Sequence, residues 1–225
     1  MGYHCVVIDL NPNNFLALHF GFSLADRRGL FSSAQQQLEK AGFSGARSRA
    51  EGSLTYVPFG QLTNNEQFML CESLIKQPGW LKRQLAQLDL KPNTLVLLDV
   101  PYYCEALQQQ AYQAATYVIN VLACDARAYP AMRAFHEIYK TRQQQHQAYL
   151  LFNQVAPQLS LNTMLLDLLQ TEINPDLQIP VLLQRDQHLP EALATQQCIQ
   201  QYNRQAQAAA DYEALALWFK LTLEQ

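Results

Sequence analysis

The sequence is poor in the features that mark membrane, secreted and nucleic-acid-binding proteins. No apolar run approaches the ~18–20 residues of a membrane span. No basic region followed by an apolar segment opens the chain, so neither membrane insertion nor a signal peptide is expected. The five cysteines form no CxxC pair, which favours reduced thiols in a cytoplasmic protein. With 16 Lys and Arg against 19 Asp and Glu, the net charge is −3, and direct binding to nucleic acid is not expected.

The sequence does contain the alternating pattern of an α/β protein. At 225 residues, 49% of them hydrophobic, the chain can build a large core, and we expect a single domain over residues 1–225. Short apolar runs alternate with longer segments of helical spacing, which predicts three layers: a mostly parallel sheet with helices on both faces. Six strands are predicted, at Cys5–Ile8, Leu54–Val57, Leu95–Leu98, Tyr117–Leu122, Tyr149–Phe152 and Ile179–Leu183.

Helices are predicted between these strands from capping residues, apolar spacing and breaks. Asn64 and Asn65 are candidate caps for one of them, and Pro130 suits the first turn of another. The stretch Gly42–Gly52 holds three glycines and is predicted to be a loop. The predicted helices end at Lys40 or span residues 64–76, 80–88, 105–115, 129–147, 157–169, 186–198 and 206–223.

Two of the predicted strands end in the same way, with an acid followed by a proline. Asp9 ends the first strand and Pro12 follows it; Asp99 ends the third and Pro101 follows it. Ligands of open α/β sheets bind at the carboxyl ends of the strands, so both acids are expected at one shared edge. Two carboxylates there can hold Mg²⁺ through water beside the phosphates of a nucleotide. The alternative is that each acid caps the turn that follows it.

Three further polar residues are expected at the ends of later strands. Asn153 ends the fifth strand, and its amide has the donor and acceptor needed to bind a purine edge. It is equally suited to cap a helix. Arg185 and Asp186 follow the last strand, where they either contact a ribose or base or form a surface ion pair of little energetic value.

The two acidic strand ends resemble those of the MinD/ParA group of P-loop ATPases. A longer resemblance is to the BcsQ (YhjQ) family of cellulose biosynthesis proteins. It is carried by VVIDLNPNNFLALHF near the N-terminus, by VPFGQLTNNEQ at Val57–Gln67 and by LLQRDQHLPEALA near the C-terminus. PFGQL is the most specific of these pieces, and the similarity runs from Val6 to the closing helix.

The resemblance implies roles for the candidate residues. Asp99 matches the acid that supports Mg²⁺ through water, and Asp9 matches the first acid of the catalytic motif. Asn11 stands where MinD and ParA carry a second acid, and because an amide is no base, ATP hydrolysis is in doubt. Asn153 matches the purine-binding Asn, and Arg185 with Asp186 matches the loop beside the base.

The resemblance also implies ATP and Mg²⁺ as cofactors and a nucleotide-dependent homodimer. BcsQ-like proteins act in the cytoplasm, at the inner-membrane cellulose synthase and secretion complex or at a cell pole, with a small BcsR-like partner. The expected function is therefore regulation or assembly of bacterial cellulose synthesis. Two alternatives remain open: a degenerate ATPase fold that serves as a scaffold without nucleotide, and a partitioning ATPase of the ParA type.

One expected motif is missing. Neither GxxxxGK[ST] nor its deviant form KGGxGK[ST] occurs among the eight glycines, so no phosphate-binding loop is recognised. In the family this loop, with its strand and helix, precedes the part that the chain matches. We therefore expect a chain truncated at its N-terminus, with a changed strand order or a partner filling the gap as alternatives. Without the missing strand, Leu95–Leu98 would lack a neighbour on one side.

Overall fold

The computed structural model describes residues 2–23, 26–32, 43, 49–133 and 147–224. It divides into two compact units, residues 1–115 and 116–225, and each is described by itself. The prediction of a single domain over residues 1–225 stays a prediction. In the described part of the chain, no helix combines the length and apolar character needed to cross a membrane.

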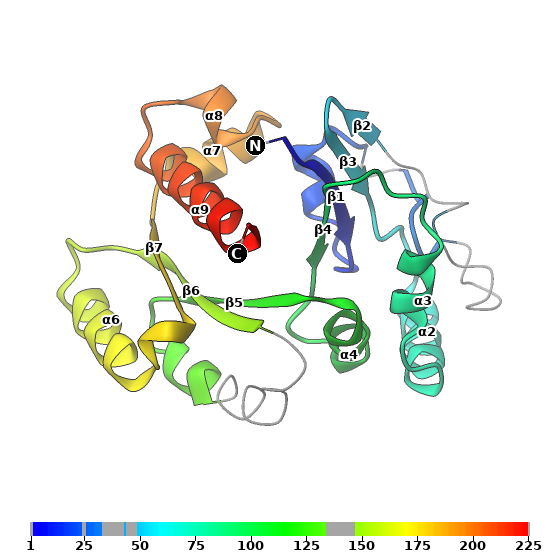
Figure 1. Ribbon diagram of the computed structural model, residues 1–225, viewed down its shortest axis with the longest axis horizontal. Coiled ribbons are helices and arrows are strands. Elements are labelled where there is room, and N and C mark those ends of the chain that lie inside the picture. Colours follow the sequence, from blue (N-terminus) through cyan, green and yellow to red (C-terminus); the bar gives the residue numbers. More distant parts are fainter. Residues whose placement is uncertain (1, 24–25, 33–42, 44–48, 134–146, 225) are drawn as a thin grey trace. The chain divides into compact units, whose positions relative to one another are not determined.

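The first unit is built on a four-stranded sheet (Figure 1). Strand β1 lies between β3 and β4 and is parallel to both, as predicted for buried apolar strands. An additional strand, β2, pairs antiparallel with β3. The order is β2-β3-β1-β4, with bounds β1 His4–Asp9, β2 Arg49–Glu51, β3 Leu54–Val57 and β4 Thr94–Asp99.

Strand β2 corrects the last part of the loop predicted over Gly42–Gly52; residues 42 and 44–48 of that prediction lie outside the described residues. Its three residues are joined to β3 by the two-residue turn Gly52–Ser53, and Gly52 has a φ of 61°. Two-residue hairpin turns need positive φ, which glycine adopts without strain. The glycine that indicated a loop is therefore the turn of a hairpin. The helix predicted to end at Lys40 lies outside the described residues.

Helix α2 (Asn64–Lys76) begins as the sequence predicts but is capped by a different residue. The Oγ1 atom of Thr63 accepts a hydrogen bond from the backbone N–H of Glu66, and the Glu66 carboxylate accepts one from the backbone N–H of Thr63 at 2.6 Å. This reciprocal pair is a capping box. Thr63, rather than Asn64 or Asn65, is thus the N-cap.

Helices cover the two faces of this sheet unequally. The larger core lies on one face, where α2 packs with α3 (Trp80–Ala86) and α4 (Glu105–Ala114) against Ile8 and Val57. The other face is covered over β1 and β3 by α1 (Leu16–His19) and by aromatic side chains that stack on Tyr56. Both faces of the sheet therefore carry helices, as predicted.

Strand β4 is less buried than its apolar sequence predicts. Leu97 lies opposite Val7 in the parallel register, on the face that α1 covers, yet it is 48% exposed. The apolar cluster around α1 contains Val7 and Tyr56 but does not extend to Leu97. Within the described strands, β4 has a neighbour on one side only. An edge strand with one covered face explains the exposure.

The second unit contains a three-stranded parallel sheet in the order β5-β6-β7 (Figure 1). One face packs against α6 and the helical residues 128–133, the other against α9. Tyr149 and Trp218 meet edge to face across that second contact, 4.9 Å between ring centroids. The bounds are β5 Tyr117–Ala123, β6 Gln147–Val155, α6 Ser160–Glu172, η2 Pro175–Leu177, β7 Gln178–Gln184, α7 His188–Ala194, α8 Ile199–Tyr202 and α9 Gln207–Leu223.

Two helix predictions in this unit need correction. Within the segment 186–198 only α7, residues 188–194, is helical; a turn follows in which Gln196 has a φ of 56°, and the separate helix α8 begins after the segment, at Ile199. The long helix predicted over 129–147 is helical through residue 133, and Gln147 already belongs to β6. Residues 134–146 lie outside the described part of the chain.

Candidate functional site

The two acidic strand ends of the first unit lie side by side. In the parallel register of β1 and β4, Asp9 is opposite Asp99. The backbone N–H of Leu10 donates to the carbonyl oxygen of Asp99 at 2.9 Å, which extends the pairing past the end of β1. The expected shared edge is therefore confirmed for these two residues.

Asp9 is a fully buried carboxyl group. Its Oδ1 accepts a hydrogen bond from the backbone N–H of Asn11 at 2.8 Å, and its Oδ2 accepts one from the hydroxyl of Tyr56 at 3.0 Å. Burial, reinforced by the nearby charge of Asp99, raises the pKa of Asp9 to about 6 despite these two bonds. Burial and the charge of Asp99 therefore disfavour the ionised form that the Asp9 carboxyl takes at neutral pH.

Tyr56 and Tyr103 complete this cluster, and sequence reasoning missed both. Burial, followed by the charge of Asp9, raises the pKa of Tyr56, so its hydroxyl remains a donor at any working pH. Tyr103 donates to the Oδ1 atom of Asn11 at 2.9 Å, and Asn13 donates from its Nδ2 to the Tyr103 hydroxyl at 3.2 Å. The only signal for Tyr103 was its place two residues after Pro101.

Asp99 and the two prolines have simpler surroundings. Asp99 is half-buried, and burial raises its pKa. The carbonyl oxygen of Pro101 accepts a hydrogen bond from Gln108 at 3.2 Å, and that of Pro12 accepts one from Asn14 at 3.3 Å. Both prolines thus contribute a backbone carbonyl to hydrogen bonds within the turns after the two acids.

The donor set at this edge fits a magnesium ion held partly through water. Carboxylate oxygens are the protein ligands that Mg²⁺ prefers, and the ion commonly keeps waters and ligand phosphates as its other ligands. Among the residues that the structure describes, no three His, Cys, Asp or Glu side chains group closely enough to hold a metal by themselves. Asp99 is the better placed ligand, because both oxygens of Asp9 already accept hydrogen bonds.

Gly60 of the PFGQL segment is hydrogen-bonded to the turn that follows β1. Asn14 brackets Gly60: its Nδ2 donates to the carbonyl oxygen of Gly60 at 2.7 Å, and its Oδ1 accepts from the Gly60 N–H at 3.2 Å. Gly29 lies against the same residue, because a Cβ atom added to Gly29 would meet the Gly60 nitrogen at 2.2 Å. The turn after β1 is thereby fastened to the segment after β3.

In the second unit, Asn153 does not end its strand, contrary to prediction. Strand β6 continues to Val155, and the Oδ1 atom of Asn153 accepts a hydrogen bond from the backbone N–H of Gln154 at 2.8 Å. Gln154 has a φ of 55°, and the pairing with β7 shifts register between Phe152 and Val155. An irregularity of this kind leaves the backbone polar groups in need of other partners.

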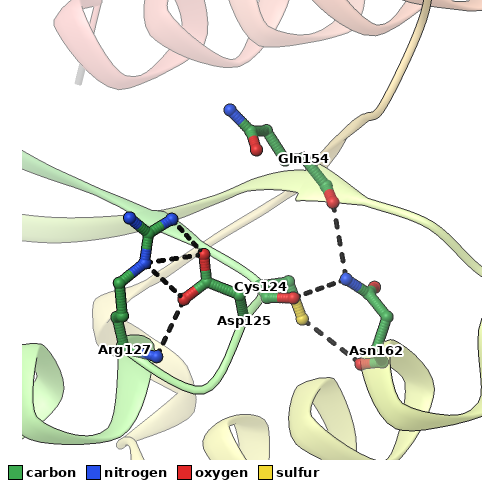
Figure 2. Close-up of polar contacts among 5 residues, drawn as sticks. All are labelled: Cys124, Asp125, Arg127, Gln154 and Asn162. Carbon is green, nitrogen blue, oxygen red and sulfur yellow. Dashed lines mark hydrogen bonds and ion pairs between the residues drawn. The ribbon is translucent and has the colours of Figure 1, made fainter.

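Asn162 of α6 supplies those partners. Figure 2 shows its side-chain amide donating to the backbone carbonyl oxygens of Cys124 and Gln154, while its backbone carbonyl oxygen accepts from the Cys124 thiol. Beside them, Asp125 and Arg127 form an exposed ion pair in the turn that follows β5. Sequence reasoning missed Asn162, since nothing in its local sequence marks a residue that joins two strand ends.

Asp186 has a structural role in the observed contacts. Its Oδ2 accepts a hydrogen bond from the backbone N–H of Ala208 at the start of α9, and its Oδ1 accepts one from the backbone N–H of His188. These bonds, with that from Ala208 first, lower the pKa of Asp186. Its ion-pair contact is with His188 at 2.7 Å rather than with Arg185. The backbone N–H of Arg185 donates to Val155 at 2.8 Å, which places Arg185 at the ends of β6 and β7.

A protein-family model described as cellulose biosynthesis protein BcsQ matches residues 1–219. The chain belongs to the BcsQ family. It is 24% identical over 227 residues to BcsQ of Salmonella typhimurium, a match that covers 97% of this chain and 82% of that protein. BcsQ of Escherichia coli K12 matches with the same identity and coverage.

Solved structures with a similar fold include MinD and partition proteins. MinD of Pyrococcus horikoshii, complexed with Mg-ADP, matches with a TM-score of 0.71 and 14% identity over 96% of this chain and 82% of that one. A putative plasmid partition protein of Borrelia burgdorferi bound to AMPPNP matches with a TM-score of 0.72 and 14% identity over 98% and 88%. At such identities the likeness shows the fold alone, and it confirms the predicted MinD/ParA-like fold for this member of the BcsQ family.

Proposed function

We propose that this chain regulates or assembles the bacterial cellulose machinery, and that the Asp9–Asp99 edge is the place where a magnesium nucleotide acts on it. Membership of the BcsQ family supports the process. The observation that carries the site is the register that sets Asp9 opposite Asp99 at the carboxyl ends of two parallel strands. Two of the structural neighbours contain nucleotide, MinD with Mg-ADP and the partition protein with AMPPNP.

In this proposal each residue has a distinct task. Asp99 would hold Mg²⁺ through water, and Asp9 orients the turn at Asn11 by accepting a hydrogen bond from the Asn11 N–H. Asn11, whose Oδ1 accepts a hydrogen bond from Tyr103, would lie at the same edge as the phosphates, but its amide cannot act as a base. Asn153, Arg185 and Asp186 are proposed to contact the base and ribose. The working form is a cytoplasmic homodimer with a BcsR-like partner at the cellulose synthase complex.

Because the 225 residues contain no Gly-rich phosphate-binding loop, we expect a low affinity for ATP. Backbone N–H groups of such a loop grip the phosphates, so we expect this chain to bind ATP poorly. Calorimetric titration with MgATP tests this for the wild type, for Asp99→Ala and for Asp89→Ala, an exposed acid of the same unit. Micromolar binding by the wild type would contradict the expected weakness. If the wild type did bind MgATP, a loss of that binding in Asp99→Ala but not in Asp89→Ala would still support the site.

Cellulose output tests the function itself. In a cellulose-producing bacterium that lacks its own copy, we expect the wild-type chain and Asp89→Ala to restore dye-binding cellulose, and Asp99→Ala to restore it several-fold less. Circular dichroism of the purified variants checks that each one folds. Failure of the wild-type chain to restore any cellulose, with the host's own protein as a positive control, would overturn the proposed process.

A scaffold without nucleotide is the second candidate, and one observation favours it. Both carboxylate oxygens of Asp9 are used within the protein, by Tyr56 and by the Asn11 N–H, as in a purely structural buried acid. Full cellulose output from a folded Asp99→Ala variant would select the scaffold over the nucleotide-dependent factor.

A further inference from the structure

Two cysteines meet beside the candidate site. Cys71 lies in the middle of α2, and Cys104 is the residue that precedes the first turn of α4. Their Sγ atoms are 3.3 Å apart in a thiol–thiol hydrogen bond. Both residues are half-buried and pack against the core of the first unit, which holds the two thiols together.

The surroundings of Cys104 favour its thiolate. The hydrogen bond with Cys71, helped by the N–H groups of Leu107 and Ala106 at the start of α4, lowers the pKa of Cys104 to about 6 against the opposing effect of burial. The same contact raises the pKa of Cys71, which therefore remains the protonated partner. A thiolate beside a thiol is the arrangement found in reactive cysteine pairs, because the thiolate is the nucleophile in oxidation and exchange.

We propose that Cys71 and Cys104 form a reversible disulfide that ties helix α2 to the turn following Asp99. A disulfide needs an S–S distance of about 2.05 Å, so the two Sγ atoms must close in from 3.3 Å. The turn that it would fix, residues 100–104, carries Tyr103 and hence the hydrogen bond to Asn11. Because no ligand takes part in forming the disulfide, its test does not depend on nucleotide binding.

Hydrogen peroxide serves as the oxidant in a two-step reaction. The Cys104 thiolate attacks one peroxide oxygen, the O–O bond breaks, and hydroxide leaves and takes up a proton to become water, which makes Cys104 a sulfenic acid. The sulfur of Cys71 then attacks the Cys104 Sγ as it gives up its proton, the S–O bond breaks, and a second water leaves. Two thiols thus lose two electrons and two protons, and one peroxide is reduced to two waters.

Peptide mass spectrometry without reduction tests the proposal on the whole 225-residue chain. After peroxide treatment and blocking of free thiols, we expect a Cys71–Cys104 cross-link, a loss of two hydrogen atoms and a loss of two of the five blockable thiols. Lys76 and Lys82 separate the two cysteines for trypsin. Fragment spectra distinguish Cys104 from Cys124 on the same peptide, and dithiothreitol should reverse the change.

Matched variants test whether the cross-link requires both Cys71 and Cys104. Cys71→Ser and Cys104→Ser should each abolish the cross-link, whereas Cys198→Ser, which removes an exposed cysteine of the other unit, should leave it intact. Serine is a favoured N-cap, so Cys104→Ser is expected to fold. The proposal is overturned if peroxide oxidises Cys198 while Cys71 and Cys104 stay blockable, or if the bonds that form join two chains.

The pH dependence of alkylation gives a second readout. The rate at Cys104 should rise with a midpoint near pH 6 in the wild type and at a higher pH in Cys71→Ala, because that variant removes the hydrogen bond with Cys71. An unchanged midpoint in Cys71→Ala would contradict the pairing of the two thiols.

Discussion

Among single residues, Asp9 carries the clearest energetic signature. It is buried, it faces Asp99 across the register, and its two hydrogen bonds do not offset the loss of water around the charge. In the unfolded chain an Asp side chain titrates near pH 3.9, whereas in the folded protein the pKa of Asp9 is about 6. The folded state therefore binds this proton more tightly than the unfolded state does.

Linkage fixes the direction of the resulting pH dependence. The stability that Asp9 contributes is present below about pH 4 and is lost as the pH rises through about 6. The free energy of unfolding of the wild type, relative to an Asp9→Asn variant that does not titrate there, should fall by roughly 2–4 kcal/mol between pH 4 and pH 7.5. Urea denaturation of both proteins at the two pH values measures this difference. A constant or rising difference would contradict the raised pKa.

Residue-level prediction from the sequence found the acids and missed their partners. Asp9, Asn11 and Asp99 were recognisable because each follows an apolar strand at a known edge of the sheet. Tyr56 lies on another strand, 47 positions from Asp9, and Tyr103 lies 92 positions from Asn11. A hydrogen bond over such separations depends on the tertiary fold, which local patterns do not specify.

At the scale of elements, two acids hold helix α9 against β7, the buried Asp211 and the half-buried Asp186. Asp211 of α9 accepts a hydrogen bond from the backbone N–H of Gln184 at 2.8 Å, and Asp186 beyond β7 accepts one from Ala208 in the first turn of α9. Buried backbone donors need such partners because water does not reach them. The helix and the strand are thus held at a fixed position along each other.

Removal of one acid should loosen this attachment. Asp211→Ala leaves the Gln184 N–H without its partner, which should lower the free energy of unfolding by about 1–3 kcal/mol. The exposed neighbour Glu213 provides the control, because Glu213→Ala on the same helix should stay within about 0.5 kcal/mol of the wild type. Chemical denaturation followed by tryptophan fluorescence is suitable, since Trp218 lies on α9. Equal effects of the two substitutions would contradict the structural role of Asp211.

Most elements of the fold were predictable from periodicity, and the exceptions have physical causes. All six predicted strands are present, because their unbroken apolar runs are typical of parallel strands with helices on both sides. The sequence did not reveal β2, whose three residues are stabilised by pairing with β3 rather than by apolar character. Asn153 was misplaced because β6 continues through an irregularity that α6 stabilises from outside the strand.

At the scale of the molecule, the family resemblance rests on segments with different roles, some at the candidate site and some structural. The acidic strand ends form the candidate site, whereas PFGQL is mainly structural: Asn14 brackets Gly60, and Gly29 touches it. The sequence predicted the fold and the edge at Asp9 and Asp99. The missing phosphate loop, the dimer and the part of the site assigned to Asn153, Arg185 and Asp186 remain predictions. The last three residues lie in the second unit, which is described by itself.

The contact between Gly29 and Gly60 has a consequence for variation along the chain. Gly29 is not among the residues with positive φ, so its need for glycine comes from space alone, whereas Gly52 has positive φ but open surroundings. In a library that varies every codon, position 29 should reject even alanine, at a cost of about 1–3 kcal/mol or more, while position 52 should accept several side chains at a smaller cost. Survival counts from such a library, or denaturation of Gly29→Ala beside Gly52→Ala, would rank the two. A glycine can thus be required only because a neighbouring backbone occupies the space that a side chain would need.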